Sequence, residues 1–174
     1  MLGRDEFREW IDAYHGALFR HALWMTGDRE LAADLVQETY YQAWRARRSL
    51  RERTRAFAWL LTILRRRVFQ EYGRARRERD WAAQFVAASE EAAEGPVGEM
   101  IDLARGLHEL TAVQRDIVLL HALHGMSYEE IAAYLQVPLG TVMSRLARAR
   151  DALRQLMETG KADNIVPFRK KAES

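Results

Sequence analysis

Hydrophobic positions in the first third of the chain recur at steps of three and four, the spacing of a helix with one buried face. Between residues 5 and 25 these positions are Phe7, Ile11, Tyr14, Leu18, Ala22 and Met25. Gly27 ends this first helix, and Asp28 is placed to cap a second one. A third helix is predicted from near Arg55 to Gly73. The pattern therefore predicts three amphipathic helices that bury one face each.

The second half of the chain starts a new set of helical patterns. Residues 78–98 lose the clear period and end in Gly95-Pro96-Val97-Gly98, a run that breaks helices. Helical register resumes at Glu99. Two capping boxes are predicted further on, the first formed by Thr111 with Gln114 and the second by Ser127 with Glu130.

No segment alternates with period two over a useful length, so the predicted class is all-α. We expect two small helical domains joined by a flexible linker. The predicted boundaries are 1–77 for the first domain, 78–98 for the linker, 99–158 for the second domain and 159–174 for a C-terminal tail. Trp81 and Phe85 lie four apart in the linker and also fit a short docked helix.

Charge is unevenly distributed although the net charge of the chain is only +2. Residues 45–79 hold thirteen arginines against three glutamates, whereas residues 80–109 hold seven acidic residues against one arginine. A basic block of this size, with aromatic residues in it, indicates an anionic partner, and nucleic acid is the favoured one. A solvated helix face is the alternative interpretation.

The composition narrows the possible chemistry. The chain holds no cysteine, which excludes disulfides, thiolate zinc ligands and thiol nucleophiles. No apolar run approaches the ~20 residues of a membrane-spanning helix, and the first residues lack the apolar segment of a signal peptide. We therefore expect a cytoplasmic protein without membrane insertion, cofactor or small-molecule substrate.

Five histidines offer no catalytic constellation. His121 and His124 lie three apart on a predicted helix and could form half of a zinc site, but no further ligand is evident nearby. Packed or solvated histidines are the favoured interpretation. No metal site and no catalytic residue are predicted, so the chain is not expected to be an enzyme.

The segment from Gly125 to Leu146 has the pattern of a helix, a tight turn and a second helix. Pro138 suits the first turn of the second helix, where its missing N–H costs nothing. When Val142 and Leu146 face inward, polar side chains remain on the outer side, as a reader of the DNA major groove requires. These outer residues are Thr141, Ser144, Arg145 and Arg148. A plain helical hairpin with solvated arginines is the alternative.

Residues 125–150 resemble region 4 of the extracytoplasmic-function (ECF) sigma factors, a branch of the sigma-70 family. The shared run is Gly-x-Ser-Tyr-Glu-Glu-Ile-Ala, then Val-Pro-x-Gly-Thr-Val-x-Ser-Arg-Leu, then Arg-Ala-Arg. Met143 stands where the family has lysine or arginine, and Thr111 replaces a usual proline. The resemblance implies that one set of residues faces the minus-35 promoter element and its phosphates. That set is Gly140, Thr141, Ser144, Arg145 and Arg148.

The run Asp34-Leu35-Val36-Gln37-Glu38-Thr39-Tyr40, followed by Ala43-Trp44-Arg45, resembles the signature of sigma region 2.2. Helical geometry turns Leu35, Val36 and Thr39 to the core and leaves an outward strip on the opposite side. The region 2.2 strip consists of Asp34, Gln37, Glu38 and Tyr41. From the residues alone it would be an ordinary solvated face, but the resemblance implies that it docks on the clamp helices of the polymerase β′ subunit.

The run from Trp59 to Arg66 resembles the helix that meets the melted minus-10 strand in this family. An aromatic side chain beside arginines can hold unstacked bases and a phosphate backbone. The implied minus-10 set is Trp59, Ile63, Arg65, Arg66 and Gln70. Arg66 and Gln70 replace the family's asparagine and aspartate, and Trp59 fits a base pocket and a core position equally well.

The two resemblances cover most of residues 28–77 and 105–154 in the family's order. Together they imply an alternative sigma factor that directs core RNA polymerase to promoters by minus-35 recognition and minus-10 melting. The implied partners are the β′ clamp helices, the β flap, promoter DNA and an anti-sigma factor. The alternatives are a stand-alone helix-turn-helix regulator and a sigma-like mimic that binds an anti-sigma factor.

Overall fold

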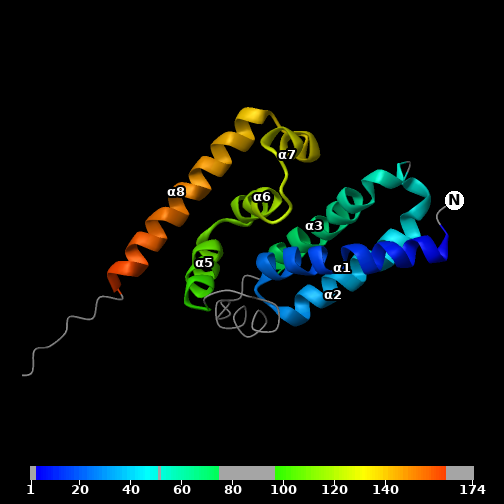
Figure 1. Cartoon of the computed structure of the whole chain (residues 1–174), viewed down its shortest axis with the longest axis horizontal. Coiled ribbons are helices and arrows are strands. Elements are labelled where there is room, and N and C mark those ends of the chain that lie inside the picture. The colour runs from blue at the N-terminus through cyan, green and yellow to red at the C-terminus, as the bar shows by residue number, and fades with distance from the viewer. Residues whose placement is uncertain (1–2, 51, 75–96, 164–174) are drawn as a thin grey trace, which may run out of the picture.

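A computed structural model describes residues 3–50, 52–74 and 97–163, and Figure 1 shows their arrangement. These residues form seven α-helices and no strand, which confirms the all-α class. The helices are α1 (Arg4–Thr26), α2 (Arg29–Ala46), α3 (Ala56–Arg74), α5 (Val97–Glu109), α6 (Ala112–Ala122), α7 (Tyr128–Leu135) and α8 (Leu139–Asp163). Two 3-10 turns, Arg47–Ser49 and Arg53–Arg55, lie between α2 and α3.

Helices α1, α2 and α3 pack against one another as a three-helix domain. Its core contains Leu18, Val36 and Leu60, whose side chains are almost fully buried. Gly27 ends α1 in the left-handed conformation, with φ 66°, and donates its N–H to the Leu23 carbonyl. Asp28 caps α2 by accepting a 3.0 Å hydrogen bond from the Leu31 amide. The predicted stop and cap are both confirmed.

Helices α5 to α8 form the second domain, in which α8 packs against α5, α6 and α7. Both predicted capping boxes are formed: Thr111 accepts from the Gln114 amide and Ser127 from the Glu130 amide. At Gly106 an added Cβ would lie 3.0 Å from Leu153 Cδ2. The small residue therefore lets α5 approach α8 closely.

The turn between α7 and α8 differs in detail from the prediction. Gln136 ends α7 in the left-handed conformation, with φ 55°. Pro138 precedes α8 rather than lying in its first turn, and its carbonyl accepts hydrogen bonds from the Thr141 and Val142 amides. Proline suits this position as well, because its carbonyl opens the helix while its missing N–H is not needed.

Two helices extend past the predicted domain boundaries at residues 99 and 158. Helix α5 begins at Val97, two residues before the predicted start of the second domain. Gly98 is tolerated there because first-turn amides make no intrahelical hydrogen bond. Helix α8 continues to Asp163, beyond the predicted end at residue 158, because one interior glycine costs only about 1 kcal/mol. The linker's flexibility, Trp81, Phe85 and the tail after 163 lie outside the described residues.

The two domains lie against each other, with α6 packed on α1 and the region of α7 beside α3. In Figure 1, α8 runs along the outer side of the second domain, away from α1 to α3. No helix in the described ranges is long and apolar enough to cross a membrane.

Candidate nucleic-acid interface

Helices α7 and α8, with the turn between them, present the predicted minus-35 set on one surface. Val142, Leu146 and Ala149 are buried against the rest of the domain, which orients the opposite side of α8 outward. Of the predicted residues, three are exposed and two are partly exposed. The exposed residues are Gly140, Ser144 and Arg148, and the partly exposed ones are Thr141 and Arg145. The N-terminal half of α8 thus carries short polar side chains and two arginines together.

Two large apolar side chains flank this surface. Leu139 is 39% exposed and Met143 is 51% exposed, and they lie one turn apart at the start of α8. Met143 is uncharged and cannot form an ion pair with a phosphate. This side of α8 therefore offers an apolar surface, of the kind that contacts the thymine methyl group in the major groove.

The region 2.2 strip lies on α2. Asp34, Gln37 and Tyr41 are exposed, and the Arg45 guanidinium lies 5.6 Å from the Tyr41 ring centre. Glu38 is different, because its Oε1 accepts hydrogen bonds from Arg67 Nη2 at 2.7 Å and from Gln42 at 2.9 Å. The Glu38 carboxylate therefore also ties α2 to α3.

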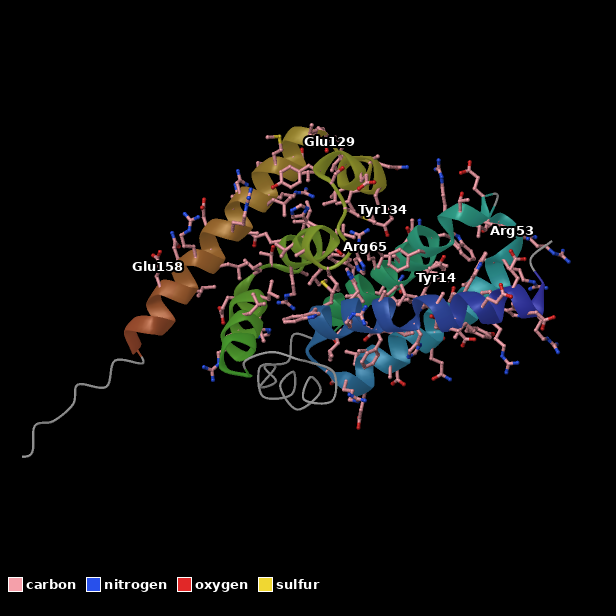
Figure 2. The ribbon with its side chains drawn as sticks, viewed as in Figure 1. Tyr14, Arg53, Arg65, Glu129, Tyr134 and Glu158 are labelled. Carbon is pink, nitrogen blue, oxygen red and sulfur yellow. The ribbon has the colours of Figure 1, made fainter. Side chains whose placement is uncertain are left out.

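The five residues of the predicted minus-10 set do not share one face of α3. Trp59 and Ile63 are partly buried against the core, and Arg66 and Gln70 are exposed on the same side of the helix. Trp59 is thus both packed and accessible. Arg65 projects from another side of α3, toward the second domain, as Figure 2 shows.

Arg65 forms an ion pair with Asp116 of α6, which is only 2% exposed. Arg65 Nε donates to both carboxylate oxygens at 2.8 and 3.0 Å, and Arg65 Nη2 donates to Oδ2. His21 of α1 places Nε2 3.4 Å from Asp116 Oδ1. Burial raises the pKa of Asp116, but His21 and Arg65 outweigh it and hold that pKa below its ordinary value. The carboxylate is therefore ionised within the contact.

The two histidines of this contact come from different domains. His21 Nδ1 lies 3.1 Å from His124 Nε2, and the rings stack with centres 5.2 Å apart. Phe57 of α3 meets the His124 ring edge-on at 5.3 Å. Burial, with the charges of His21 and Arg20, lowers the pKa of His124 to about 4, and Asp116 opposes this only in part. His124 is thus neutral near pH 7 in this arrangement.

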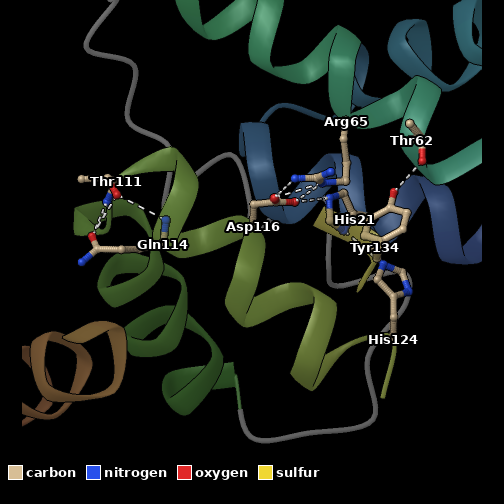
Figure 3. Close-up of polar contacts among 8 residues, drawn as sticks. All are labelled: His21, Thr62, Arg65, Thr111, Gln114, Asp116, His124 and Tyr134. Atoms are coloured by element: carbon tan, nitrogen blue, oxygen red, sulfur yellow. Dashed lines mark hydrogen bonds and ion pairs between the residues drawn. The ribbon is translucent and has the colours of Figure 1, made fainter. Parts of the chain in front are cut away.

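Tyr134 of α7 completes the contact. Its hydroxyl oxygen accepts a 3.1 Å hydrogen bond from Thr62 Oγ1, and its ring lies 5.3 Å from the Arg65 guanidinium carbon. Burial raises the pKa of Tyr134, against the opposing effects of Thr62 and Arg65. Figure 3 shows these groups together. We term them the interdomain cluster, consisting of His21, Thr62, Arg65, Asp116, His124 and Tyr134.

Arg115, next to Asp116, is 3% exposed and holds the ends of two helices. Its guanidinium donates to the carbonyl of Met25 in α1 at 2.6 Å, which also crosses between the domains. It further donates to the carbonyls of Leu107 at 2.7 Å, His108 at 2.8 Å and Leu110 at 3.2 Å. A cation at helix C-termini is favourable because exposed carbonyls carry partial negative charge there.

Arg115 and Asp116 were not predicted as site residues from the sequence. The signal was present: two charged residues directly precede the apolar run Ile117 to Leu120 on a helix whose start was correctly predicted. Charged side chains are almost never fully buried unless they are paired, so their presence on an apolar helix indicates partners elsewhere in the fold. The sequence alone does not say where those partners lie.

Comparison with known families identifies both domains. Residues 10–78 match sigma-70 region 2 and residues 101–153 match sigma-70 region 4. These two regions in one chain define a sigma factor, a protein that brings RNA polymerase to promoters. The chain belongs to the ECF RNA polymerase sigma factors, whose members include relatives that match almost its full length. It is therefore an alternative sigma factor.

Two curated relatives illustrate the similarity. EcfG of Rhodopseudomonas palustris is 32% identical over 165 residues, covering 94% of this chain and 91% of the relative. SigL of Mycobacterium tuberculosis is 33% identical over 156 residues, covering 87% and 88%. Both relatives are ECF RNA polymerase sigma factors.

Two solved structures share the fold. The sigma factor RpoE in complex with the anti-sigma factor NepR from Bartonella quintana has a TM-score of 0.68 and 28% identity, covering 88% of this chain and 97% of that one. CnrH in complex with the cytosolic domain of CnrY has a TM-score of 0.68 and 27% identity, covering 90% of each chain.

Proposed function

We propose that this sigma factor works in the cytoplasm through three surfaces and catalyses no reaction itself. The outer face of α8 reads the minus-35 element, the Trp59 side of α3 meets the melted minus-10 strand, and the region 2.2 strip docks on the β′ clamp helices. The second domain also contacts the β flap. One observation carries the proposal. The chain has both a helix with an exposed polar face, α8, and the exposed region 2.2 strip on α2 of the other domain. A stand-alone regulator has no need of that strip.

The test is transcription in vitro with purified core polymerase on genomic DNA. The protein alone should bind duplex promoter DNA weakly, because a single small module buries only about 600–1,000 Å² on DNA. With core it should direct initiation at specific promoters, visible by sequencing the transcripts. A strong footprint by the protein alone, unchanged by core, would support the stand-alone regulator instead.

We further propose an anti-sigma factor as regulator, a cytoplasmic segment of a membrane protein that competes with core for the region 2.2 strip. The RpoE structure, which contains the anti-sigma factor NepR, supports this class of partner. A pull-down from native cells should recover such a protein in complexes that lack core. A ternary complex with core that still transcribes would contradict occlusion as the mechanism.

Reversing the charge of Asp34 should weaken binding to core polymerase without unfolding the protein. Asp34 is exposed on α2, and a charge-assisted contact at a desolvated interface is worth ~1–3 kcal/mol, roughly 5- to 150-fold in affinity. Titration of labelled core with Asp34→Arg measures it. Glu38 is a poorer choice because its reversal also repels Arg67.

Glu9→Arg is the matched control for Asp34→Arg, because it makes the same charge change at an exposed position of α1. It should bind core like the wild-type protein. If both variants bound core polymerase with equal affinity, the region 2.2 strip would not be the docking surface.

Trp59→Ala should impair promoter opening more than initial promoter binding by the holoenzyme. Stacking on an aromatic side chain is worth ~1–3 kcal/mol per unstacked base. Permanganate reactivity of the minus-10 thymines measures promoter opening. Trp59→Phe keeps an aromatic face and should retain most of this reactivity. Because Trp59 is partly buried, folding is checked by circular dichroism. Full reactivity in a folded Trp59→Ala protein would make the side chain purely structural.

A further inference from the structure

A row of three exposed apolar side chains lies on α8 beside the predicted minus-35 set. The row consists of Leu139, Met143 and Ala147, which are four residues apart and therefore share one side of the helix. The core of the domain does not explain them, because a different side of α8 is buried. Large apolar side chains in water are costly, so their position next to a DNA-reading surface indicates contact with another molecule.

Gly140 separates this apolar row from Ser144, and the fold does not require a glycine there. Its φ is not positive, and an added Cβ would meet nothing within 4 Å. Glycine is less favourable than alanine in a helix, so the conformation and packing of α8 give no reason for it. A glycine at such a position allows another molecule to approach the backbone closely. The open space therefore lies between the apolar row and the polar side of the same face.

The chemistry of the row selects one base. In the major groove only thymine presents a methyl group, at C5, whereas guanine, adenine and cytosine present hydrogen-bonding groups alone. An apolar side chain gains from burying that methyl group and gains nothing from the other bases. Met143 is well suited to this contact, because its flexible thioether adapts to an irregular surface. A lysine or arginine at the same position would favour guanine or a phosphate instead.

We propose that Leu139 and Met143 select thymine in the minus-35 element by burying its C5 methyl group against the apolar row. The inference rests on the proposed minus-35 role of α8 and names the base contact within it. Arg145 and Arg148 lie on the other side of Gly140, where contacts to phosphates fix the register of the helix in the groove. The arginines thus position α8, and the apolar row discriminates between base pairs.

Replacing single thymines with deoxyuridine tests the contact, because this change removes only the methyl group. Promoters identified by transcript sequencing supply the duplex fragments, and holoenzyme assembled with the full chain binds them in competition. Uracil at one or more thymines of the minus-35 element should weaken binding about fourfold for each methyl group that α8 buries. Uracil at thymines of the spacer between the two elements should have no effect.

A double variant links this penalty to the apolar row. Leu139→Ala Met143→Ala places a good helix former at two exposed positions, and it should bind the thymine and uracil fragments equally. Leu103→Ala is the matched control, because Leu103 has the same 39% exposure as Leu139 but lies on α5. It should keep the wild-type penalty for uracil.

Salt dependence separates the apolar contact from a phosphate contact. Met143→Ala should lower the affinity for the promoter without changing the slope of log affinity against log salt concentration, because no counterion-releasing contact is lost. Arg148→Ala should make that slope shallower by about 0.9, the value for one phosphate contact. A shallower slope in Met143→Ala would contradict the apolar contact.

Three results would overturn the inference: a minus-35 element without an A·T pair, no penalty from uracil on either strand, or a penalty that persists in the double variant. Absence of the penalty together with weaker binding of the double variant to core polymerase would assign the apolar row to a protein contact instead. If the holoenzyme initiates at specific promoters but ignores uracil, only this inference fails. If it initiates at none, the proposed function itself fails.

Discussion

Replacing Arg115 with methionine should lower the free energy of unfolding by about 3–5 kcal/mol, the largest effect we expect from a single substitution. Methionine keeps the apolar length of the side chain but leaves four carbonyls without their charged donor. Those carbonyls lie at the ends of α1 and α5, where the helical amide donors run out. The Leu107 carbonyl keeps a 3.3 Å hydrogen bond from the Leu110 amide. For a small domain, the loss corresponds to more than about 10 °C in Tm.

Thermal and urea unfolding, followed by circular dichroism, measure the effect of Arg115→Met. Arg105→Met is the matched control, because Arg105 is exposed on α5 and its charge is in water. Arg115→Lys should be nearly as destabilising as Arg115→Met, since one ammonium cannot replace the planar fork that reaches several carbonyls. If Arg115→Met unfolded like Arg105→Met, the carbonyls would be satisfied by water and Arg115 would have no structural role.

Features set by neighbours in the sequence were predicted correctly. Asp28 caps α2, Ser127 and Glu130 form their capping box, and Gly27 ends α1, because each depends on residues within one turn of the chain. The region 2.2 strip is also placed on an α2 surface as predicted, since helical periodicity fixes which side chains share a face. The partner of that face is not a local property.

Features set by the other domain were missed. Arg65 belongs to the run that resembles the family's minus-10 helix, but in the structure it pairs with Asp116 of α6 on another side of α3. The sequence separation is 51 residues. His21 and His124 are 103 residues apart, and nothing in either neighbourhood indicates the other. Pairing across domains is therefore the part of the site that periodicity cannot supply.

Lowering the pH from 7.5 to 5 should favour separation of the two domains (the open form) over the arrangement in which the interdomain cluster is intact (the closed form). His124 has a pKa of about 4 in the closed arrangement, whereas the same side chain in water has a pKa near 6.5. Between these values the open form binds more protons, so the closed form is fully favoured above pH 6.5 and is progressively lost as the pH falls toward 4. Below about pH 4, protonation of the Asp116 carboxylate further destabilises the closed form, because that form holds the pKa of Asp116 below its ordinary value.

The charged and titratable groups around His124 decide the size of this effect. His21 and Arg20 of α1 disfavour its protonation, Asp116 of α6 favours it, and Phe57 of α3 contributes only burial. A single proton changes the open-to-closed ratio by at most tenfold per pH unit, and by less here because His124 is partly exposed and its interactions are screened by solvent. We therefore expect roughly a tenfold change between pH 6.5 and 5.

Spin labels at Ala13→Cys on α1 and Arg154→Cys on α8, two exposed positions in a chain without cysteine, report this opening as loss of the short distance at pH 5 and its return at pH 7.5. His124→Gln keeps a polar side chain that cannot titrate, so its distances should not respond to pH in this range. His121→Gln, which changes an exposed histidine of α6 two residues after Leu119, should respond like the wild-type protein. A pH response that persisted between pH 6.5 and 4 in His124→Gln would contradict the assignment to His124, because glutamine takes up no proton in this range.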